Sequence, residues 1–210
     1  MKEIGCVENN SKNKKRNPKK IITKIILCGF LLVILYLCFR EVTNVDYKVE
    51  GASMLPTLKS GDLWTGKLCN TDHCRNFLKR GETVVVNLGS DGPITGEVIK
   101  RIIGLPLDTV TIADGNVYIN GYKLIEEYTQ GKISSNHGYN CISFYPGTDE
   151  LVILGDNREH SWDARGFGVV KLSKVKAYAS FDKYNDISLG PVISQEKLSI
   201  PEEECPDFSY

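Results

Sequence analysis

The chain has 210 residues, of which 41% are hydrophobic and 25% are charged, a length and composition that support one domain with a real core and exclude a disordered or fibrous protein. The formal net charge of zero hides an uneven distribution, because residues 1–40 hold nine Lys or Arg against two Glu, while the remainder holds 17 basic against 24 acidic residues. This acidic body argues against nucleic acid as a partner, since nucleic-acid binding needs a cationic surface.

A long apolar run follows the basic residues of the N-terminus. Residues 21–39 contain one charge, Lys24, near enough to the end of the run to reach lipid headgroups. As a helix the run spans about 28 Å, close to the roughly 30 Å hydrocarbon core of a bilayer. A cleavable signal peptide would have a shorter apolar core and would end in small residues before the cut. Here the run ends at Leu37-Cys-Phe-Arg, without an Ala-x-Ala pattern, which favours a permanent transmembrane anchor.

The basic N-terminus also predicts the orientation of this anchor. By the positive-inside rule, residues 1–20 form a basic cytoplasmic tail and the chain after about residue 40 lies outside. We therefore expect a single-pass protein of the cell membrane, with residues 41–193 as an extracytoplasmic domain. Residues 194–210, which contain an acidic stretch, are expected to form a loosely ordered C-terminal tail.

The predicted extracytoplasmic domain consists mostly of short strands separated by turn signals. Runs rich in β-branched residues predict strands at residues 83–88, 97–104, 109–113, 116–120 and 151–154. Asp114-Gly115, between two of these runs, indicates a tight hairpin, because both residues accept positive φ angles. No sustained helical period follows residue 40. The predicted fold class is therefore mainly β: a single transmembrane helix, then an all-β domain with irregular loops.

Four of the seven cysteines lie in the part predicted to be extracytoplasmic, namely Cys69, Cys74, Cys141 and Cys205. A disulfide between Cys69 and Cys74 would close a small loop in an oxidising compartment. The two could also stay free thiols, or form with His73 a fragment of a metal site that lacks a second ligand pair. The sequence leaves these alternatives open.

Two segments hold the residue types of a nucleophile and a base. In residues 51–58, Ser53 lies between small residues with Pro56 three positions on, which suits a hydroxyl held on a rigid turn. In the predicted strand 97–104, Lys100 and Arg101 are adjacent, so alternation directs them to opposite faces and at least one points inward. Burial drives a lysine toward its neutral form, and a neutral amine can activate a serine. Taken alone, Ser53 is most plainly a serine of a surface loop. For Lys100 a snorkelling or salt-bridged lysine is the alternative, and the buried base is the favoured interpretation.

A third segment, residues 155–168, directly follows the predicted strand 151–154. It is dense in hydrogen-bonding side chains and is bounded by glycines. A polar surface loop would explain its charges, but not so many side chains of fixed geometry packed together. The segment is therefore typical of a loop that orients catalytic groups.

In this order, the three segments resemble the motif boxes of the bacterial type I signal peptidases. Residues 53–58 are similar to the nucleophile box, residues 100–108 to the lysine box and residues 155–165 to the third, and Gly61-Asp62 also fits. The resemblance implies a membrane-bound serine endopeptidase that cleaves signal peptides from exported preproteins, with a catalytic dyad of Ser53 as nucleophile and Lys100 as general base. It also assigns supporting positions to Asp156, Arg158, Ser161, Asp163 and Arg165, and shallow substrate pockets to Val49, Met54, Leu58 and Ile99.

The same resemblance implies how the supporting groups act and what the chain binds. Ser161 matches the serine whose hydroxyl helps to orient the lysine amine, and Asp163 and Arg165 are expected to form an ion pair near the dyad. Signal peptides and membrane lipid are the expected partners, with the secretion translocon as a further candidate. No nucleic acid, metal or organic cofactor is expected.

Two positions depart from the family pattern. Gly51 stands where some members carry a serine that helps to hold the oxyanion. The oxyanion hole would then rest on backbone N–H groups, chiefly that of Ser53. Leu107 stands where a glycine commonly follows the proline of the lysine box. We expect this change to affect a turn and to leave the dyad untouched.

Three other interpretations compete with this one. His160, Ser161 and Asp163 could form a Ser–His–Asp triad, but a protease that uses Lys100 needs none of the three histidines in the chain. The SOS-repressor autopeptidases use Ser and Lys on a related all-β core, but they are soluble regulators with a DNA-binding module. An inactive or specialised membrane-tethered β module that binds secreted peptides is the third, and the presence together of Ser53, Lys100 and Ser161 argues against it.

Overall fold

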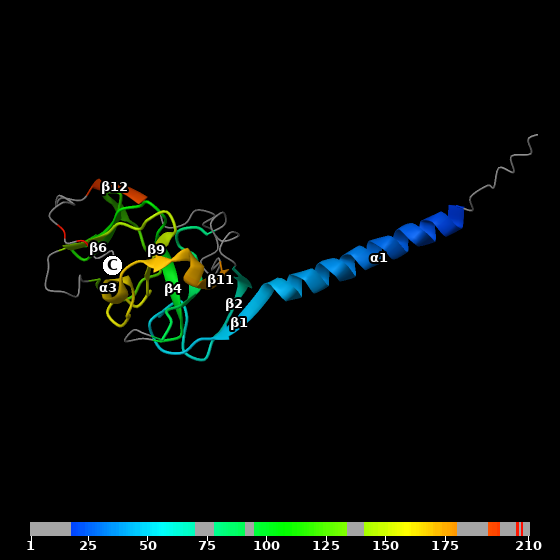
Figure 1. The fold of residues 1–210 in the computed structure, drawn as a ribbon, viewed down its shortest axis with the longest axis horizontal. Helices are drawn as coiled ribbons and strands as arrows, with labels where there is room; N and C mark the ends of the chain where they lie inside the picture. Colours follow the sequence, from blue (N-terminus) through cyan, green and yellow to red (C-terminus); the bar gives the residue numbers. More distant parts are fainter. Residues whose placement is uncertain are drawn as a thin grey trace, which may run out of the picture. The chain divides into compact units, whose positions relative to one another are not determined.

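The computed structural model describes residues 18–69, 78–90, 95–133, 141–179 and 193–197, together with Cys205 and Asp207. The chain divides into two compact units, Met1–Thr43 and Asn44–Tyr210. Figure 1 follows both units along the sequence from blue to red. Most of the predicted basic tail, together with His73, Cys74 and His137, lies outside the described residues.

The described part of the first unit is a single helix, α1 (Pro18–Thr43). Proline suits the first turn of a helix because the N–H that it lacks would have no partner there. The helix predicted at residues 21–39 is present and extends further at both ends. Its described apolar side chains are exposed, as Phe30 is at 63%. In the part of the chain that the structure describes, no helix combines the length and apolar character required of a membrane span.

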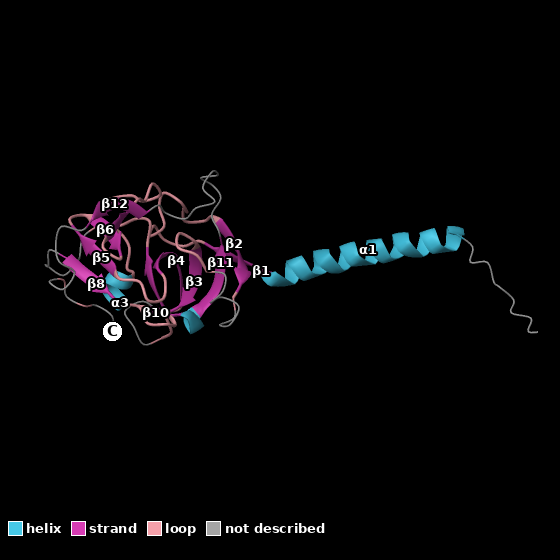
Figure 2. Cartoon of the chain, turned by 90° about the horizontal axis from the view of Figure 1, so that it is seen from above, coloured by secondary structure: helices cyan, strands magenta, loops and turns pink. Residues whose placement is uncertain are grey.

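The second unit contains two antiparallel sheets, and Figure 2 shows β5, β6, β8 and β12 grouped apart from β1, β2, β3 and β11. Within the described residues the larger sheet has seven strands, in the spatial order β1 (Asn44–Lys48), β2 (Leu63–Leu68), β11 (Val175–Ala179), β3 (Thr83–Asn87), β4 (Glu97–Gly104), β9 (Glu150–Leu154) and β10 (Val170–Lys171). The smaller has five, in the order β12 (Ile193–Lys197), β7 (Tyr122–Leu124), β6 (Asn116–Ile119), β5 (Val110–Ala113) and β8 (Cys141–Phe144).

Strand β4 is an inner strand of the larger sheet, paired with β3 on one side and β9 on the other. Its residues enter three apolar clusters: Ile102 packs in one, Ile103 in a second, and Ile99 against a third. Both faces of its second half are therefore covered, which explains why a continuous apolar run forms this strand. Any polar side chain on that half of β4 has to be buried.

The strands predicted from the sequence are confirmed, and β4 has the predicted bounds. Strands β1, β2, β7, β8, β10, β11 and β12 were not predicted, and neither were the short helix α3 (Ala164–Phe167) and the 3₁₀ turn η1 (Leu172–Lys174). Of the tail expected at residues 194–210, the structure describes residues 194–197, Cys205 and Asp207. Strand β12 pairs with β7, and Cys205 forms a disulfide with Cys141 of β8. These contacts tie residues 193–197 and Cys205 to the smaller sheet.

Candidate active site

Ser53 lies in the loop that connects β1 and β2. Two backbone hydrogen bonds close the neck of this loop, from Val49 N to Asp62 O at 2.9 Å and from Gly61 N to Val49 O at 2.8 Å. At the tip, Asn157 donates from its backbone N to Ser53 O at 3.0 Å and from Nδ2 to Ala52 O at 3.1 Å. The predicted nucleophile loop is thus held against the third motif segment.

Lys100 is the fourth residue of β4 and is buried, with 4% of its surface exposed. Its Nζ lies 2.8 Å from Ser53 Oγ and 3.1 Å from the carbonyl oxygen of Ile99. The two residues that the sequence singled out as nucleophile and base are therefore within hydrogen-bond distance of each other. This is the geometry that direct proton transfer from the hydroxyl to the amine requires.

Burial lowers the pKa of Lys100 from 10.5 to about 8, because a buried site disfavours the charged ammonium. The negative charges of Asp163 and Asp156 oppose this shift. With a pKa near 8, about a tenth of the amines are neutral at pH 7, and this fraction grows as the pH rises. The site can thus supply a neutral amine beside a serine hydroxyl.

The second cation of β4, Arg101, is buried as well and holds Asp156. Its Nε lies 2.8 Å from Oδ1 and its Nη2 lies 2.6 Å from Oδ2 of that carboxylate. The hydroxyl of Thr57, in the nucleophile loop, donates to the same Oδ2 at 2.5 Å. Burial alone would lower the pKa of Arg101, but the hydrogen bond and the charge of Asp156 outweigh it and raise the pKa. Asp156 therefore joins the nucleophile loop, the lysine strand and the third segment.

The predicted ion pair between Asp163 and Arg165 is present and fully buried. Arg165 Nε and Nη2 each lie 2.8 Å from a carboxylate oxygen of Asp163, a two-point contact that fixes both groups. Asp163 Oδ2 also accepts from Gly155 N at 2.9 Å, and Arg165 Nη1 donates to Arg158 O at 2.7 Å. The pair therefore holds the backbone of the third segment at two places.

Gly155 is where this backbone packs against Ser53. A Cβ at Gly155 would lie 2.2 Å from Ser161 Oγ and 2.5 Å from the carbonyl oxygen of Ser53, closer than atoms can approach. Ser161 Oγ is buried and has no hydrogen-bond partner among the described residues. Its predicted hydrogen bond to the Lys100 amine is thus not formed in this structure. What Ser161 does contribute is close packing against Gly155.

The four residues expected to bind substrate lie together in one apolar cluster. Val49, Met54 and Leu58 are buried there, and the half-buried Ile99 packs against them. Because little of the first three is exposed, most of their surface packs against other residues of the protein. The structure therefore brings these residues together, and their contact with substrate remains a prediction.

Sequence reasoning gave no function to Glu126, Tyr128 or Thr57. The buried Arg158 pairs with Glu126, Nη1 lying 2.8 Å from Oε2, and the charge of Glu126 outweighs burial and raises the pKa of Arg158. The motifs themselves indicated that a further carboxylate was needed. They contain three arginines, Arg101, Arg158 and Arg165, and the structure pairs two of these with Asp156 and Asp163. A buried third arginine requires a carboxylate from elsewhere.

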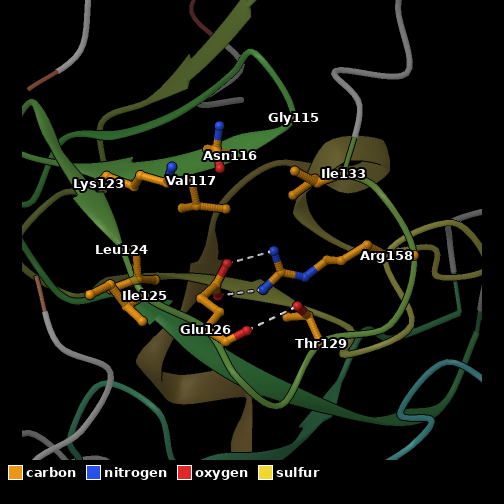
Figure 3. Close-up of a pocket in the computed structure, with 11 residues that line it drawn as sticks. Gly115, Asn116, Val117, Lys123, Leu124, Ile125, Glu126, Thr129, Ile133 and Arg158 are labelled. Atoms are coloured by element: carbon orange, nitrogen blue, oxygen red, sulfur yellow. Dashed lines mark hydrogen bonds and ion pairs between the residues drawn. The ribbon is translucent and has the colours of Figure 1, made fainter. Parts of the chain in front are cut away.

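Glu126 and Arg158 also line a pocket of about 230 Å³. Figure 3 shows Arg158 reaching toward Glu126 at its wall, below Val117 and Asn116 of β6. Its lining includes neither Ser53 nor Lys100. It is therefore separate from the predicted site of cleavage.

The alternative triad of His160, Ser161 and Asp163 is wrong. His160 is exposed, the hydroxyl of Ser161 has no hydrogen-bond partner among the described residues, and both oxygens of Asp163 bind Arg165. The histidine therefore cannot take a proton from this serine as placed. The side-chain nitrogen that the structure places beside a serine hydroxyl is instead that of Lys100, next to Ser53.

Three further residues left open by the sequence now have a conformation or a partner. Cys69 is disulfide-bonded, which excludes both a free thiol and a metal ligand at this position. Gly51 has a φ of 86° and Leu107 a φ of 68°. Gly51 thus adopts a backbone that side chains with a Cβ rarely take, and Leu107 keeps a conformation that favours glycine.

Comparison with known proteins finds matches over most of the chain. The family model described as "Signal peptidase, peptidase S26" matches residues 22–183. The chain is 32% identical over 189 residues to signal peptidase I T of Bacillus subtilis (strain 168), covering 83% of this chain and 92% of that protein. It is 31% identical over 156 residues to signal peptidase I V of the same organism, covering 69% and 89%. A solved signal peptidase I from Enterococcus faecalis V583 aligns at 27% identity with a TM-score of 0.37, over 49% of this chain and 97% of that one.

Proposed function

The chain belongs to the signal peptidase family, peptidase S26, and from this premise we propose that Ser53 is its nucleophile and Lys100 its general base. Family membership makes it a serine endopeptidase that removes signal peptides from exported preproteins. The observation that carries the dyad is the 2.8 Å separation of Lys100 Nζ and Ser53 Oγ in a buried setting. Burial also favours the neutral amine that the reaction needs.

In this mechanism the neutral amine of Lys100 takes the proton of the Ser53 hydroxyl as Oγ attacks the scissile carbonyl carbon. The resulting ammonium returns the proton to the nitrogen of the leaving mature chain, and the signal peptide stays bound to Ser53 as an ester. Lys100 then takes a proton from water, whose oxygen attacks the ester carbon. The bond to Ser53 Oγ breaks, the ammonium of Lys100 returns the proton to that oxygen, and the signal peptide leaves with a free carboxyl group. With Gly51 in place of a serine, the backbone N–H of Ser53 is the proposed donor to the oxyanion.

The supporting residues hold these two groups in place. Asp156 and Arg158 restrain the backbone beside Gly155, and Asp163 with Arg165 restrains it from the other side. We include Ser161 because its buried hydroxyl has unused hydrogen-bonding capacity near this point. Val49, Met54, Leu58 and Ile99 form the proposed floor of the substrate site, which suits small side chains before the cut.

We also propose that residues 21–39 of α1 anchor the chain in the cell membrane, with the N-terminus cytoplasmic and the second unit outside. The support is the apolar sequence with its single charge, the basic residues before it, and the exposure of its described apolar side chains. Membrane lipid is then a partner, and the secretion translocon is a candidate. Alkaline extraction of membranes and protease digestion of intact spheroplasts test both points; release of the protein, or protection of the second unit, would contradict them.

The decisive experiment uses the full chain in detergent with phospholipid and a preprotein whose signal peptide ends in Ala-x-Ala. The wild type should cleave after that motif, as read from the N-terminus of the product, whereas Ser53→Ala and Lys100→Ala should not cleave. His160→Ala is the control and should cleave like the wild type. Cleavage by Lys100→Ala would refute the dyad, and binding of signal peptides without any cleavage by the wild type would favour a tethered binding module.

A further inference from the structure

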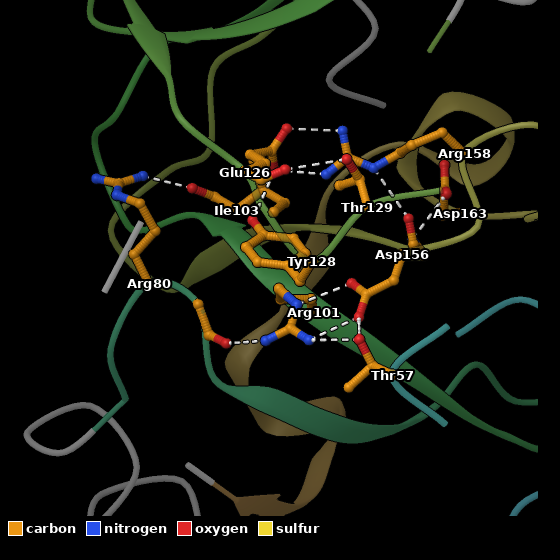
Figure 4. Close-up of polar contacts among 12 residues, drawn as sticks. Thr57, Arg80, Arg101, Ile103, Glu126, Tyr128, Thr129, Asp156, Arg158 and Asp163 are labelled. Carbon is orange, nitrogen blue, oxygen red and sulfur yellow. Dashed lines mark hydrogen bonds and ion pairs between the residues drawn. The ribbon is translucent and has the colours of Figure 1, made fainter. Parts of the chain in front are cut away.

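A short segment outside the three motifs contacts two of their buried arginines. This segment, residues 126–130, follows β7 and is called the brace below. Glu126 accepts hydrogen bonds from Nη1 and Nη2 of Arg158, and the ring of Tyr128 lies 4.0 Å from the guanidinium carbon of Arg101. Tyr128 also donates its hydroxyl to Glu126 at 2.6 Å. Figure 4 shows Tyr128 between Glu126 and Arg101, so that one segment contacts the lysine strand and the third motif.

The backbone of the brace holds the third motif as well. Gln130 N donates to Asp156 O at 2.8 Å, and Arg158 N donates to Gln130 O at 2.8 Å. The Glu126–Arg158 pair is buried, with 8% and 3% of the two side chains exposed. A buried ion pair of this kind adds little net stability compared with apolar residues of the same volume. What such a pair does provide is a defined geometry, since the two-point contact of Arg158 with the carboxylate allows few alternatives.

From Arg158 the contacts lead directly to the dyad. Arg158 Nε donates to Gly155 O at 3.0 Å. On the other side of Gly155, Ser161 Oγ and the carbonyl oxygen of Ser53 fill the space that a Cβ would occupy. The backbone of Gly155 therefore has no free space to move into there. Close-packed groups transmit a displacement instead of absorbing it. Loss of the Arg158 contact would therefore shift the backbone against which Ser53 is packed.

We propose that Glu126 is a positioning residue for catalysis: by orienting Arg158 it fixes Gly155, and Gly155 fixes the nucleophile loop against Lys100. This inference rests on the proposed function of Ser53 and Lys100. It assigns a function to a carboxylate that touches neither of them. A displacement of about 1 Å at the reacting atoms lowers a rate by about a hundredfold. A small shift of the nucleophile loop is therefore enough to reduce the rate of cleavage.

The pocket described above makes this inference testable by chemical rescue. Glu126 and Arg158 both line it, and its volume of about 230 Å³ admits a small organic anion. In Glu126→Ala the missing side chain would leave the guanidinium of Arg158 facing this space (Figure 3). Formate or acetate can then replace the carboxylate, whereas acetamide has a similar shape and no charge.

The experiment measures kcat, KM and the pH profile of the full-length Glu126→Ala in detergent with phospholipid, on an Ala-x-Ala preprotein. We expect kcat to fall about ten- to hundredfold with KM within about twofold of the wild type. The acid limb of the kcat/KM profile should move to higher pH, because a displaced loop admits water to Lys100 and burial is the main reason for its low pKa. Acetate or formate should restore much of kcat, and acetamide should not.

Glu127→Ala is the matched control, since this neighbouring carboxylate is exposed and should leave every parameter unchanged. If Glu126→Ala does not fold, Glu126→Gln keeps the shape without the charge and should show the same changes to a smaller extent. An unaltered kcat, or a loss without a shifted pH profile and without rescue, would leave Glu126 a structural residue only. Ser53→Ala and Lys100→Ala are assayed alongside: if they still cleave, the dyad itself fails, and if they are inactive while Glu126→Ala behaves as the wild type, only this inference fails.

Discussion

The side-chain nitrogen of Lys100 and the side-chain oxygen of Ser53 lie 2.8 Å apart, although 47 residues separate them in the chain. The lysine comes from an inner strand of the larger sheet and the serine from a loop closed at its neck and held at its tip. Burial of the amine, opposed by the carboxylates Asp163 and Asp156, places its pKa near 8. These two residues therefore combine short distance with an amine that is neutral in part at physiological pH.

The first prediction concerns the pH dependence of cleavage. The base must be neutral, so kcat/KM should rise about tenfold per pH unit below the pKa of Lys100, about 8, and level off above it. The profile should be measured between pH 6 and 10 with enzyme that is shown to be folded throughout. A flat profile, or activity that falls as the pH rises through 8, would contradict Lys100 as the base.

A second prediction concerns stability and follows from the same shift. The pKa of Lys100 falls from 10.5 to about 8 on folding, so at neutral pH the unfolded chain binds the proton more tightly and the lysine destabilises the fold. This penalty is complete below pH 8 and disappears above pH 10.5. Lys100→Met should therefore abolish cleavage yet raise the free energy of unfolding at pH 7 by about 1–3 kcal/mol, after allowance for the lost hydrogen bonds.

Denaturant unfolding of both proteins at pH 7 and pH 10.5 tests this prediction. The advantage of Lys100→Met should shrink as the pH rises, because the lysine becomes neutral in both states. A variant that is less stable than the wild type at pH 7 would mean that the amine is held in its charged form.

Gly155→Ala is predicted to damage both fold and activity. Its Cβ would lie 2.2 Å from Ser161 Oγ and 2.5 Å from the Ser53 carbonyl oxygen, so the nucleophile loop has to move. Overpacking of this kind lowers the free energy of unfolding by about 1–3 kcal/mol, and cleavage should fall further than stability explains. Adding Ser161→Gly should restore little, because the Ser53 carbonyl is backbone and remains in place. Gly147→Ala, whose Cβ would meet only the carboxylate of Glu150, is the control.

Leu107→Gly is predicted to stabilise the protein without affecting cleavage. Leu107 has a φ of 68° and is 74% exposed, so glycine removes backbone strain and gives up little packing. The free energy of unfolding should rise by about 0.5–1 kcal/mol. This is the strain that glycine relieves, minus the cost of the greater conformational freedom that glycine gives the unfolded chain. Leu63→Gly provides the comparison, since Leu63 is 68% exposed but lies in β2, where glycine should destabilise. Equal effects of the two substitutions on denaturant unfolding would show that Leu107 is not strained.

The chemistry of this chain was readable from local sequence at a few positions. Two cations in an apolar run required at least one cation to be buried, and the structure buries both Lys100 and Arg101. The run 97–104 forms a strand with those bounds, because both of its faces meet apolar clusters. The motif boxes led to the correct family and also predicted the pair of Asp163 and Arg165, two residues apart. Contacts at such short range depend little on the rest of the fold.

Long-range relationships were decided only by the tertiary structure. Alternation in the sequence shows which residues of a strand share a face, but it does not show which strand is the neighbour. The unpredicted strands are short, and their sequences carry no clear strand pattern of their own. The pairing of Cys141 with Cys205, 64 residues away, is one of several that four cysteines allow. Glu126 and Tyr128 lie in a turn without periodicity, and their contacts with Arg158 and Arg101 arise because a buried cation takes the carboxylate or ring that packing brings near.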